Sequence, residues 1–395
     1  MFSGGKLYYA WLLALIGITL IGAYYYVIQL QDGLIITGMS DQVSWGFYIA
    51  NFTFMVGIAA ASVLLVIPSY IFHRDDVKNV VLIGEALAVS AVITAILLIV
   101  VDLARPDRFW HIIPFIGKFN FPISILAWDV VVLYGYLFLN LFIPFYILFK
   151  HYRGQQPSLK HYFPFIVITI FWAISIHTVT AFLFSASSAR PFWHTSLLGP
   201  RFIASAFVSG PALIIVSFLL IRKYWDFQIK QAVIDMMAVI LMFALYISLF
   251  FVGVELFTDF YNESEHAASI HYLFLGLHGF NGLQPWIWTA MFVNVVAVII
   301  LSFEKLRKDM RYLVAACGLS FIGIWIEKGM GFVIPGFIPT PLGEIFEFTP
   351  TFPEIMITLA CWAVGALTFT LLARAAVSIE SGETVLPGTT GNALH

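Results

Sequence analysis

Long apolar runs are the feature that most limits what this chain can fold into. A helix needs about 20 mostly apolar residues to cross the hydrocarbon core of a bilayer. Ten segments meet that length, and they cover residues 8–30, 46–71, 80–101, 123–149, 162–186, 202–221, 232–257, 285–303, 312–334 and 353–377. We therefore predict an all-α integral membrane protein with about ten transmembrane helices.

The composition argues against a water-soluble body of this size. Of the 395 residues, 61% are hydrophobic and 11% are charged, whereas soluble domains carry about 25% charged residues. The net charge of -2 comes without any long basic cluster, which argues against a nucleic-acid partner. The first apolar run is long enough to span, and no small-residue cleavage site follows it. We interpret it as a retained helix rather than a signal peptide.

The lysines and arginines indicate an orientation, because cytoplasmic loops carry an excess of them. With the N-terminus inside, 14 of the 20 fall in inner segments: Lys6, Arg74, Lys78, Lys150, Arg153, Lys160, Arg222, Lys223, Lys230, Lys305, Arg307, Lys308, Arg311 and Arg374. Five fall in outer loops, namely Arg105, Arg108, Lys118, Arg190 and Arg201. We predict a multi-pass protein of the cytoplasmic (inner) membrane with both termini cytoplasmic.

Acidic residues recur with a spacing that suggests an internal repeat. The third helix begins near Glu85 and ends at Asp102, and the seventh begins near Asp235 and ends at Glu255 and Asp259. Repeats of this kind are common in membrane proteins. We predict two four-helix bundles flanked by the first and last helices, although chance spacing is an alternative. The bundles would occupy residues 46–186 and 202–334, with a cytoplasmic tail at 379–395.

The predicted outer loops are long and rich in proline, glycine and aromatic residues. They cover residues 102–122, 187–201, 258–284 and 335–352. Long loops in compact proteins are often functional or form interfaces, and an exposed apolar surface favours docking of another subunit. The alternative is that these loops only cover the helix ends.

Two kinds of redox site are excluded by ligand counts. Cys317 and Cys361 are the two cysteines, both in apolar stretches, and an iron–sulfur cluster held by cysteines needs four thiolates. Haem b held between two imidazoles needs two buried histidines, but His177 is the one histidine well inside a span. We therefore expect no haem, iron–sulfur cluster or metal in this chain.

Most ionisable residues within the spans lie toward the outer face. They are costly in a bilayer and mark candidate functional positions; they are Asp102, Asp129, Glu255, Asp259, Glu327, Lys328 and Glu354. Asn51 and His177 join them at depths of about 8 and 15 Å. His177 could bond to a neighbour, or exchange a proton with a bound quinone because imidazole titrates near neutral pH.

Each of the other groups also has a structural interpretation. Asn51 could hold a quinone carbonyl or make an interhelical hydrogen bond. Asp102 could pair with Arg105, and Glu327 with Lys328. Glu85 and Asp235 could begin a proton path from inside or anchor the inner interface.

Several motifs in one order resemble those of the NrfD/PsrC family of quinone-reacting membrane subunits. The motifs are DLARPDRFW at 102–110, NFPIS at 120–124, SWG at 44–46 followed by Gly57, and ARPFW at 189–193. The stretch PGFIPTPLG at 335–343, with Pro350 and Glu354, is similar to the ten-helix DsrP branch. The resemblance covers nearly the whole chain.

The resemblance implies a function. Members carry no redox cofactor of their own, bind menaquinone or ubiquinone near the outer face, and exchange electrons with a ferredoxin-like iron–sulfur subunit. The DsrP branch implies further partners, namely a multihaem cytochrome and other membrane and cytoplasmic subunits of a Dsr-type complex linked to sulfite and sulfur metabolism. On the helix matching the second span, Asn51 matches a quinone-contacting asparagine and Phe52 replaces a histidine. His177 replaces a tyrosine on the fifth.

We therefore assign quinone contact to Asn51, His177, Trp45, Phe52 and Arg105. We assign proton relay to His177, Asp102, Glu255 and Asp259. Quinol oxidation would release protons outside, whereas quinone reduction would draw them from within past Glu85 and Asp235; the sequence leaves both directions open. A secondary transporter and a cofactor-free membrane anchor are the competing hypotheses.

Overall fold

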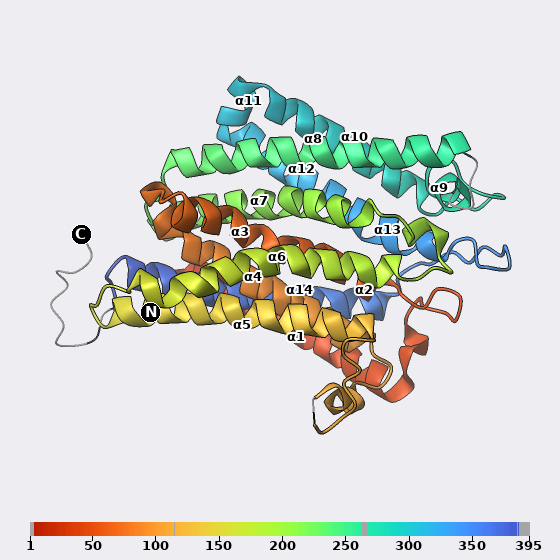
Figure 1. Cartoon of the computed structure of the whole chain (residues 1–395), viewed down its shortest axis with the longest axis horizontal. Coiled ribbons are helices and arrows are strands. Elements are labelled where there is room, and N and C mark those ends of the chain that lie inside the picture. Colours follow the sequence, from red (N-terminus) through yellow and green to blue (C-terminus); the bar gives the residue numbers. More distant parts are fainter. Residues whose placement is uncertain (1–3, 114, 263–266, 385, 387–395) are drawn as a thin grey trace.

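The helices of this protein lie side by side along the long axis of the molecule (Figure 1). The computed structural model describes residues 4–113, 115–262, 267–384 and 386. Within these residues, ten helices are long and apolar enough to cross a membrane, and there is no β-strand beyond an isolated bridge between Leu277 and Phe280. The prediction of an all-α membrane protein with about ten transmembrane helices is confirmed.

Eight of the ten spans are single helices. They are α1 (Lys6–Asp32), α4 (Asp75–Asp102), α5 (Ile125–Tyr152), α6 (Leu159–Ser185), α7 (Leu198–Tyr224), α8 (Gln231–Asn262), α10 (Gln284–Ser302) and α14 (Phe352–Glu380). Short helices α9 (Ala267–Phe274) and α11 (Glu304–Lys308) lie in connections. Most observed spans are a few residues longer than the apolar runs, because polar residues extend the helices beyond the hydrocarbon core.

The second and ninth spans are interrupted. The second starts as α2 (Phe47–Ala59), passes through a 3₁₀ turn and α3 (Val63–Val66), and ends in a π-helical turn at Ile67–Ile71. The π turn contains Pro68, which has no N–H for a regular helical bond. The ninth is α12 (Met310–Lys328) followed by α13 (Met330–Val333), with Gly329 between them. Such breaks free backbone carbonyls for side chains of neighbouring helices.

Helix α2 is the most enclosed part of the molecule. Every residue from Tyr48 to Ala59 is buried, and α2 packs against α4, α6, α7, α12 and α14. Close approach relies on small side chains, as at Gly210 of α7, where an added Cβ would stand 1.9 Å from Ala61. Any side chain on α2 therefore faces another helix, not lipid.

The two ends of the helix array differ. Helix α1 starts and α14 ends at one end, on the left of Figure 1, which we call the terminal end. The other, loop-rich end carries residues 103–124, 186–197, 275–283 and 338–351, and it corresponds to the predicted outer face. The division into two bundles at 46–186 and 202–334 stays a prediction. The predicted tail at 379–395 begins inside α14, and residues 385 and 387–395 lie outside the described part of the chain.

Candidate functional site

A buried group of charges lies near the loop-rich end, contributed by helices that are far apart in the sequence. Arg201, in the first turn of α7, bonds through one guanidinium nitrogen to Glu255 of α8. Its other terminal nitrogen lies 3.1 Å from Glu327 of α12. The side chains are 11%, 15% and 2% exposed, respectively. We call Arg201, Glu255 and Glu327 the charge triad; one guanidinium joins three helices through charge-assisted hydrogen bonds.

Lys328 stands beside the triad but is held differently. Its ammonium donates to the carbonyl of Phe202 at 3.2 Å and lies 4.5 Å from the centre of the Phe202 ring. On the α2 side, a Cβ added to Gly57 would come within 3.1 Å of the ammonium. No carboxylate in the described part of the chain lies within ion-pair distance of Lys328, since Glu327 pairs with Arg201 instead. The carbonyl of Lys328, freed by the break at Gly329, accepts from Thr53 of α2 at 3.0 Å.

His177 is a buried side chain of this region whose polar atoms are all unsatisfied within the described residues. It lies on α6, it is 1% exposed, and neither ring nitrogen has a hydrogen-bond partner among the described residues. It interacts electrostatically with Lys328. One turn further along α6, Thr180 donates to the buried Asp129 of α5 at 3.1 Å. Buried polar atoms are nearly always paired, so an orphaned imidazole calls for an explanation.

Asn51 and Phe52 lie on α2 but make different contacts. The Asn51 amide nitrogen donates to the carbonyl of Phe47 at 2.8 Å, and its oxygen accepts from the indole of Trp325 at 3.0 Å. The side chain therefore ties α2 to α12, the interhelical alternative foreseen from the sequence. Phe52 is fully buried in the hydrophobic core.

An aromatic cluster covers the loop-rich end of α2. Trp45 stacks on Trp193 with ring centroids 5.6 Å apart and meets Phe184 and Phe337 edge-on. The Arg190 guanidinium lies 4.6 Å from the centre of the Phe337 ring, and one of its terminal nitrogens is buried without a partner in the described chain. Partial burial lowers the pKa of Arg190. Trp45 is thus packed within the protein rather than lying in an interfacial belt.

Asp102 belongs to a second polar group, on the α1 and α14 side of α2. Tyr48 donates to Gln29 of α1 at 2.6 Å, and Gln29 donates to the carbonyl of Val101. Glu354, at the start of α14, accepts from the backbone of Phe47 at 3.0 Å, and it interacts electrostatically with Asp102. One carboxylate oxygen of Asp102 is buried with no partner in the described residues.

Arg105 lies apart from Asp102. Both of its guanidinium bonds, at 3.0 Å, go to the carboxylate of Asp107 in the exposed loop. The Arg105 guanidinium lowers the pKa of Asp107. The pairing of Asp102 with Arg105 foreseen as an alternative is therefore replaced by a pair within the loop.

The remaining predicted acids, Asp259, Glu85 and Asp235, are divided between the two ends of the helix array. Asp259 lies one turn beyond Glu255 on α8 and interacts electrostatically with it. Glu85 of α4 is 1% exposed, one of its oxygens has no partner in the described chain, and it interacts with Tyr70 and Tyr162. Asp235 accepts from Gln231 at 2.9 Å near the start of α8.

A large apolar cavity lies elsewhere. It measures about 940 Å³, it is at the terminal end, and none of Asn51, Phe52 or His177 lines it. The described histidines, cysteines and acids form no group that could hold a metal ion. Cys317 and Cys361 are buried, and neither forms a disulfide. The geometry brings together Lys328, Arg201 and Glu327, with His177 close enough to interact electrostatically with Lys328. It leaves Arg105 in the exposed loop and places Asp102 across α2.

Sequence reasoning missed Arg201, which it assigned to an outer loop. Helix α7 begins at Leu198, so Arg201 lies in a buried first turn. The available signal was Glu255 and Glu327, two acids at matching depth that require a nearby cation.

The fold and these charges define a polytopic membrane protein with a polar site built between its helices. The chain belongs to the NrfD family: the family model described as "Polysulphide reductase, NrfD" matches residues 36–334. The resemblance inferred from the motifs is thereby confirmed at the level of the family.

Three relatives illustrate the range of this family. The chain is 27% identical to a putative membrane subunit of dimethyl sulfoxide reductase from Halobacterium salinarum, over 92% of this chain and 90% of the relative. It is 24% identical to an Hdr-like menaquinol oxidoreductase integral membrane subunit of Archaeoglobus fulgidus, over 94% of this chain and 95% of the relative. It is 22% identical to a selenate reductase subunit of Mesobacillus selenatarsenatis, over 81% of each chain.

Proposed function

We propose that this chain is the quinone-reactive membrane subunit of an oxidoreductase complex, with a quinone headgroup site at the loop-rich end between α2, α6 and the charge triad. The relatives support the class, since their names describe subunits of reductases and an integral membrane subunit of a menaquinol oxidoreductase. The observation that carries the site is His177, a buried imidazole whose two nitrogens lack partners in the described chain.

The residues present fit a quinone headgroup. Its carbonyl oxygens accept hydrogen bonds and the hydroxyls of the quinol donate them, and a neutral imidazole offers one donor and one acceptor. Asn51 is committed to Phe47 and Trp325, so in this proposal it orients α2 against α12 beside the site. Phe52 and Trp45 would form apolar and aromatic walls of the quinone site, and Arg105 would contact the quinone from the exposed loop.

The protein's own groups would then handle protons. When bound, a quinol supplies two electrons and two protons, and a quinone takes up the same number. His177 exchanges a proton at a ring nitrogen, because both of its titratable nitrogens lack a partner in the described chain. Glu255 and Asp259 stand one turn apart on α8 and continue toward the loop-rich end. Arg201 fixes Glu255, while Asp102 provides a second acid across α2.

The electron partner in this proposal is a ferredoxin-like iron–sulfur subunit docked on the loop-rich end. Loop residues there expose large apolar side chains that no helix covers, including Phe109, Trp110, Ile123 and Leu342. Patches of this kind mark interaction surfaces. We also propose that the chain lies in the cytoplasmic membrane with both termini inside, uses menaquinone, and works in a DsrP-type complex with a multihaem cytochrome in sulfite or sulfur metabolism.

The test compares His177→Ala with Thr178→Ala in the assembled complex. Thr178 is half-buried on the same helix and its hydroxyl donates to the carbonyl of Ile174 one turn earlier, so it is a matched control. We expect His177→Ala to lower quinol oxidation at least tenfold, in the range typical for loss of a positioned acid–base group, and Thr178→Ala to leave it unchanged. An unchanged rate and quinone affinity in His177→Ala would remove this residue from the site.

A second measurement separates the competing classes. Quinone extracted in proportion to the purified complex, and lost with His177→Ala, supports the redox proposal. Its consistent absence from an intact complex would favour a transporter or a simple anchor.

A further inference from the structure

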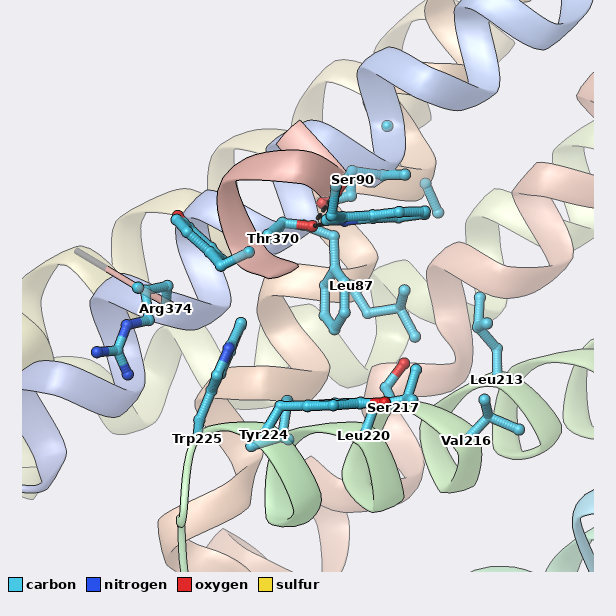
Figure 2. Close-up of a pocket in the computed structure, with 18 of the residues that line it drawn as sticks. Leu87, Ser90, Leu213, Val216, Ser217, Leu220, Tyr224, Trp225, Thr370 and Arg374 are labelled. Atoms are coloured by element: carbon cyan, nitrogen blue, oxygen red, sulfur yellow. Dashed lines mark hydrogen bonds between the residues drawn. The ribbon is translucent and has the colours of Figure 1, made fainter. Parts of the chain in front are cut away.

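An apolar crevice opens at the terminal end of the helix array, and Figure 2 shows residues that line it. Its volume is about 940 Å³, and its walls come from the start of α1 and from α4, α7 and α14, with Met55 and Ile58 of α2 and Phe321 of α12 at its inner side. Leu87, Leu213 and Leu220 are among the lining residues. A space of this size, lined mainly by apolar side chains, is typical of a ligand site.

The crevice opens toward lipid and has the depth of one bilayer leaflet. Leu7 and Trp11 of α1 and Leu220 of α7 line it and are exposed, so it opens sideways between these two helices. On α14 the lining runs from Trp362 to Arg374, which spans about 18 Å along the helix. One leaflet of a bilayer contributes about 15 Å, half of the ~30 Å hydrocarbon core.

The mouth is charged, and its lining includes Arg374, Glu383 and Asp226. Arg374 lines the crevice near the end of α14, its side chain is 14% exposed, and its guanidinium lies 5.7 Å from the centre of the Trp225 ring (Figure 2). Glu383 lies 3.9 Å from the guanidinium and is more than half exposed. A guanidinium carries five N–H donors in a planar fork, a geometry that suits the oxygens of a phosphate.

Tyr8 adds a second donor at the same place. Its hydroxyl is buried, has no hydrogen-bond partner in the described part of the chain, and interacts electrostatically with Arg374. A buried hydroxyl that is left unsatisfied costs free energy, so a partner is expected. The partner has to be an acceptor located at the depth of the lipid headgroups.

We propose that this crevice binds one anionic phospholipid from the leaflet at the terminal end. The phosphate accepts from Arg374 and Tyr8, and an acyl chain lies along Leu87, Leu213 and Leu220. Arg374 is the more buried member of its pair with Glu383, at 14% against 56% exposed, so the charge that meets the phosphate inside the crevice is positive and favours a negative headgroup. This inference does not rest on the proposed quinone chemistry, because Asn51, Phe52 and His177 do not line the crevice.

The test is native mass spectrometry of the purified full-length protein in detergent, titrated with phosphatidylglycerol and, separately, with phosphatidylcholine. We expect one tightly held phosphatidylglycerol and weaker retention of phosphatidylcholine. Arg374→Gln should weaken phosphatidylglycerol binding about fivefold, the effect of one basic side chain on an anionic lipid. Arg222→Gln is the matched control, because Arg222 lies at the same end of α7 and bonds Gln231 outside the crevice.

Two further variants test the geometry without relying on charge. Tyr8→Phe removes only the hydroxyl and should also weaken phosphatidylglycerol binding. Ser217→Phe, in the crevice wall on α7, should prevent binding of both lipids by filling the space for the acyl chain. Retained quinol oxidation by each variant in the assembled complex would show that it is folded.

Three outcomes would overturn the proposal. The first is equal retention of the two lipids, and the second is an equal loss in Arg374→Gln and Arg222→Gln. The third is that Ser217→Phe expels a bound quinone but leaves phospholipid binding intact, which would assign the crevice to a quinone.

Discussion

Neutralising Arg201 should destabilise the protein strongly, because one side chain compensates two buried carboxylates. Glu327 is 2% exposed and Glu255 15%, so water can do little to replace the guanidinium. Two unit charges about 4 Å apart attract each other by about 4 kcal/mol at an effective dielectric constant of 20, and both pairs are at least this close. Part of this sum is offset when a carboxylate takes up a proton. Breaking a buried ion pair costs about 3–5 kcal/mol, and we expect Arg201→Gln to fall in this range.

The assay is thermal unfolding of the purified protein in detergent, with three matched variants. Arg201→Lys keeps the charge but cannot bond both carboxylates through one planar fork, so its Tm should lie between those of the wild type and Arg201→Gln. A triple variant, Arg201→Met with Glu255→Gln and Glu327→Gln, removes all three charges together. It should recover most of the lost stability, because a neutral set of similar volume leaves no uncompensated charge.

Two results would refute this reasoning. If Arg201→Gln unfolds at the wild-type temperature, the triad contributes nothing to stability. If the triple variant is no more stable than Arg201→Gln, uncompensated charge is not the cause of the loss.

Three other variants address separate parts of the molecule. Glu347→Ala should speed hydrogen exchange across residues 267–283, because Glu347 accepts from Tyr272 at 3.2 Å; unchanged exchange would count against this role. Gly336→Ala should lower stability by about 1–3 kcal/mol, since its Cβ would stand 1.9 Å from the Trp193 ring, and a wild-type Tm would contradict the close packing. Glu85→Gln should slow quinone reduction if protons enter from the terminal end, and a wild-type rate of reduction would exclude that route.

The spans were predictable from the sequence because bilayer thickness sets their length. Each of the ten apolar runs corresponds to an observed span, and the ends differ by only a few residues, as in 353–377 against Phe352–Glu380. The interruptions were not predictable. Pro68 marked a weak point, but the break after Lys328 depends on Thr53 of α2 accommodating the freed carbonyl. That partner lies 275 residues away in the chain.

The candidate site was predictable in its depth but not in its pairings. Hydropathy located Glu255, Glu327 and Lys328 at the same level of the membrane, because polar residues are conspicuous in apolar runs. It could not show that Arg201 bridges the two glutamates, since those contacts join positions 54 and 126 residues apart. Nor could it show that Arg105 turns to Asp107 in its own loop.

The polar side chains of α2 argue for a built site rather than a plain anchor. Tyr48 reaches Gln29 of α1, and Thr53 reaches the carbonyl of Lys328. All residues from Tyr48 to Ala59 are buried, so each polar group has to be satisfied by a neighbouring helix. An anchoring helix in this position would be stabilised as well by apolar side chains. Helix α2 instead retains a series of paired polar groups, and the His177 imidazole on α6 beside it stays unpaired within the described residues. This arrangement is expected where a polar ligand supplies the missing hydrogen-bond partners.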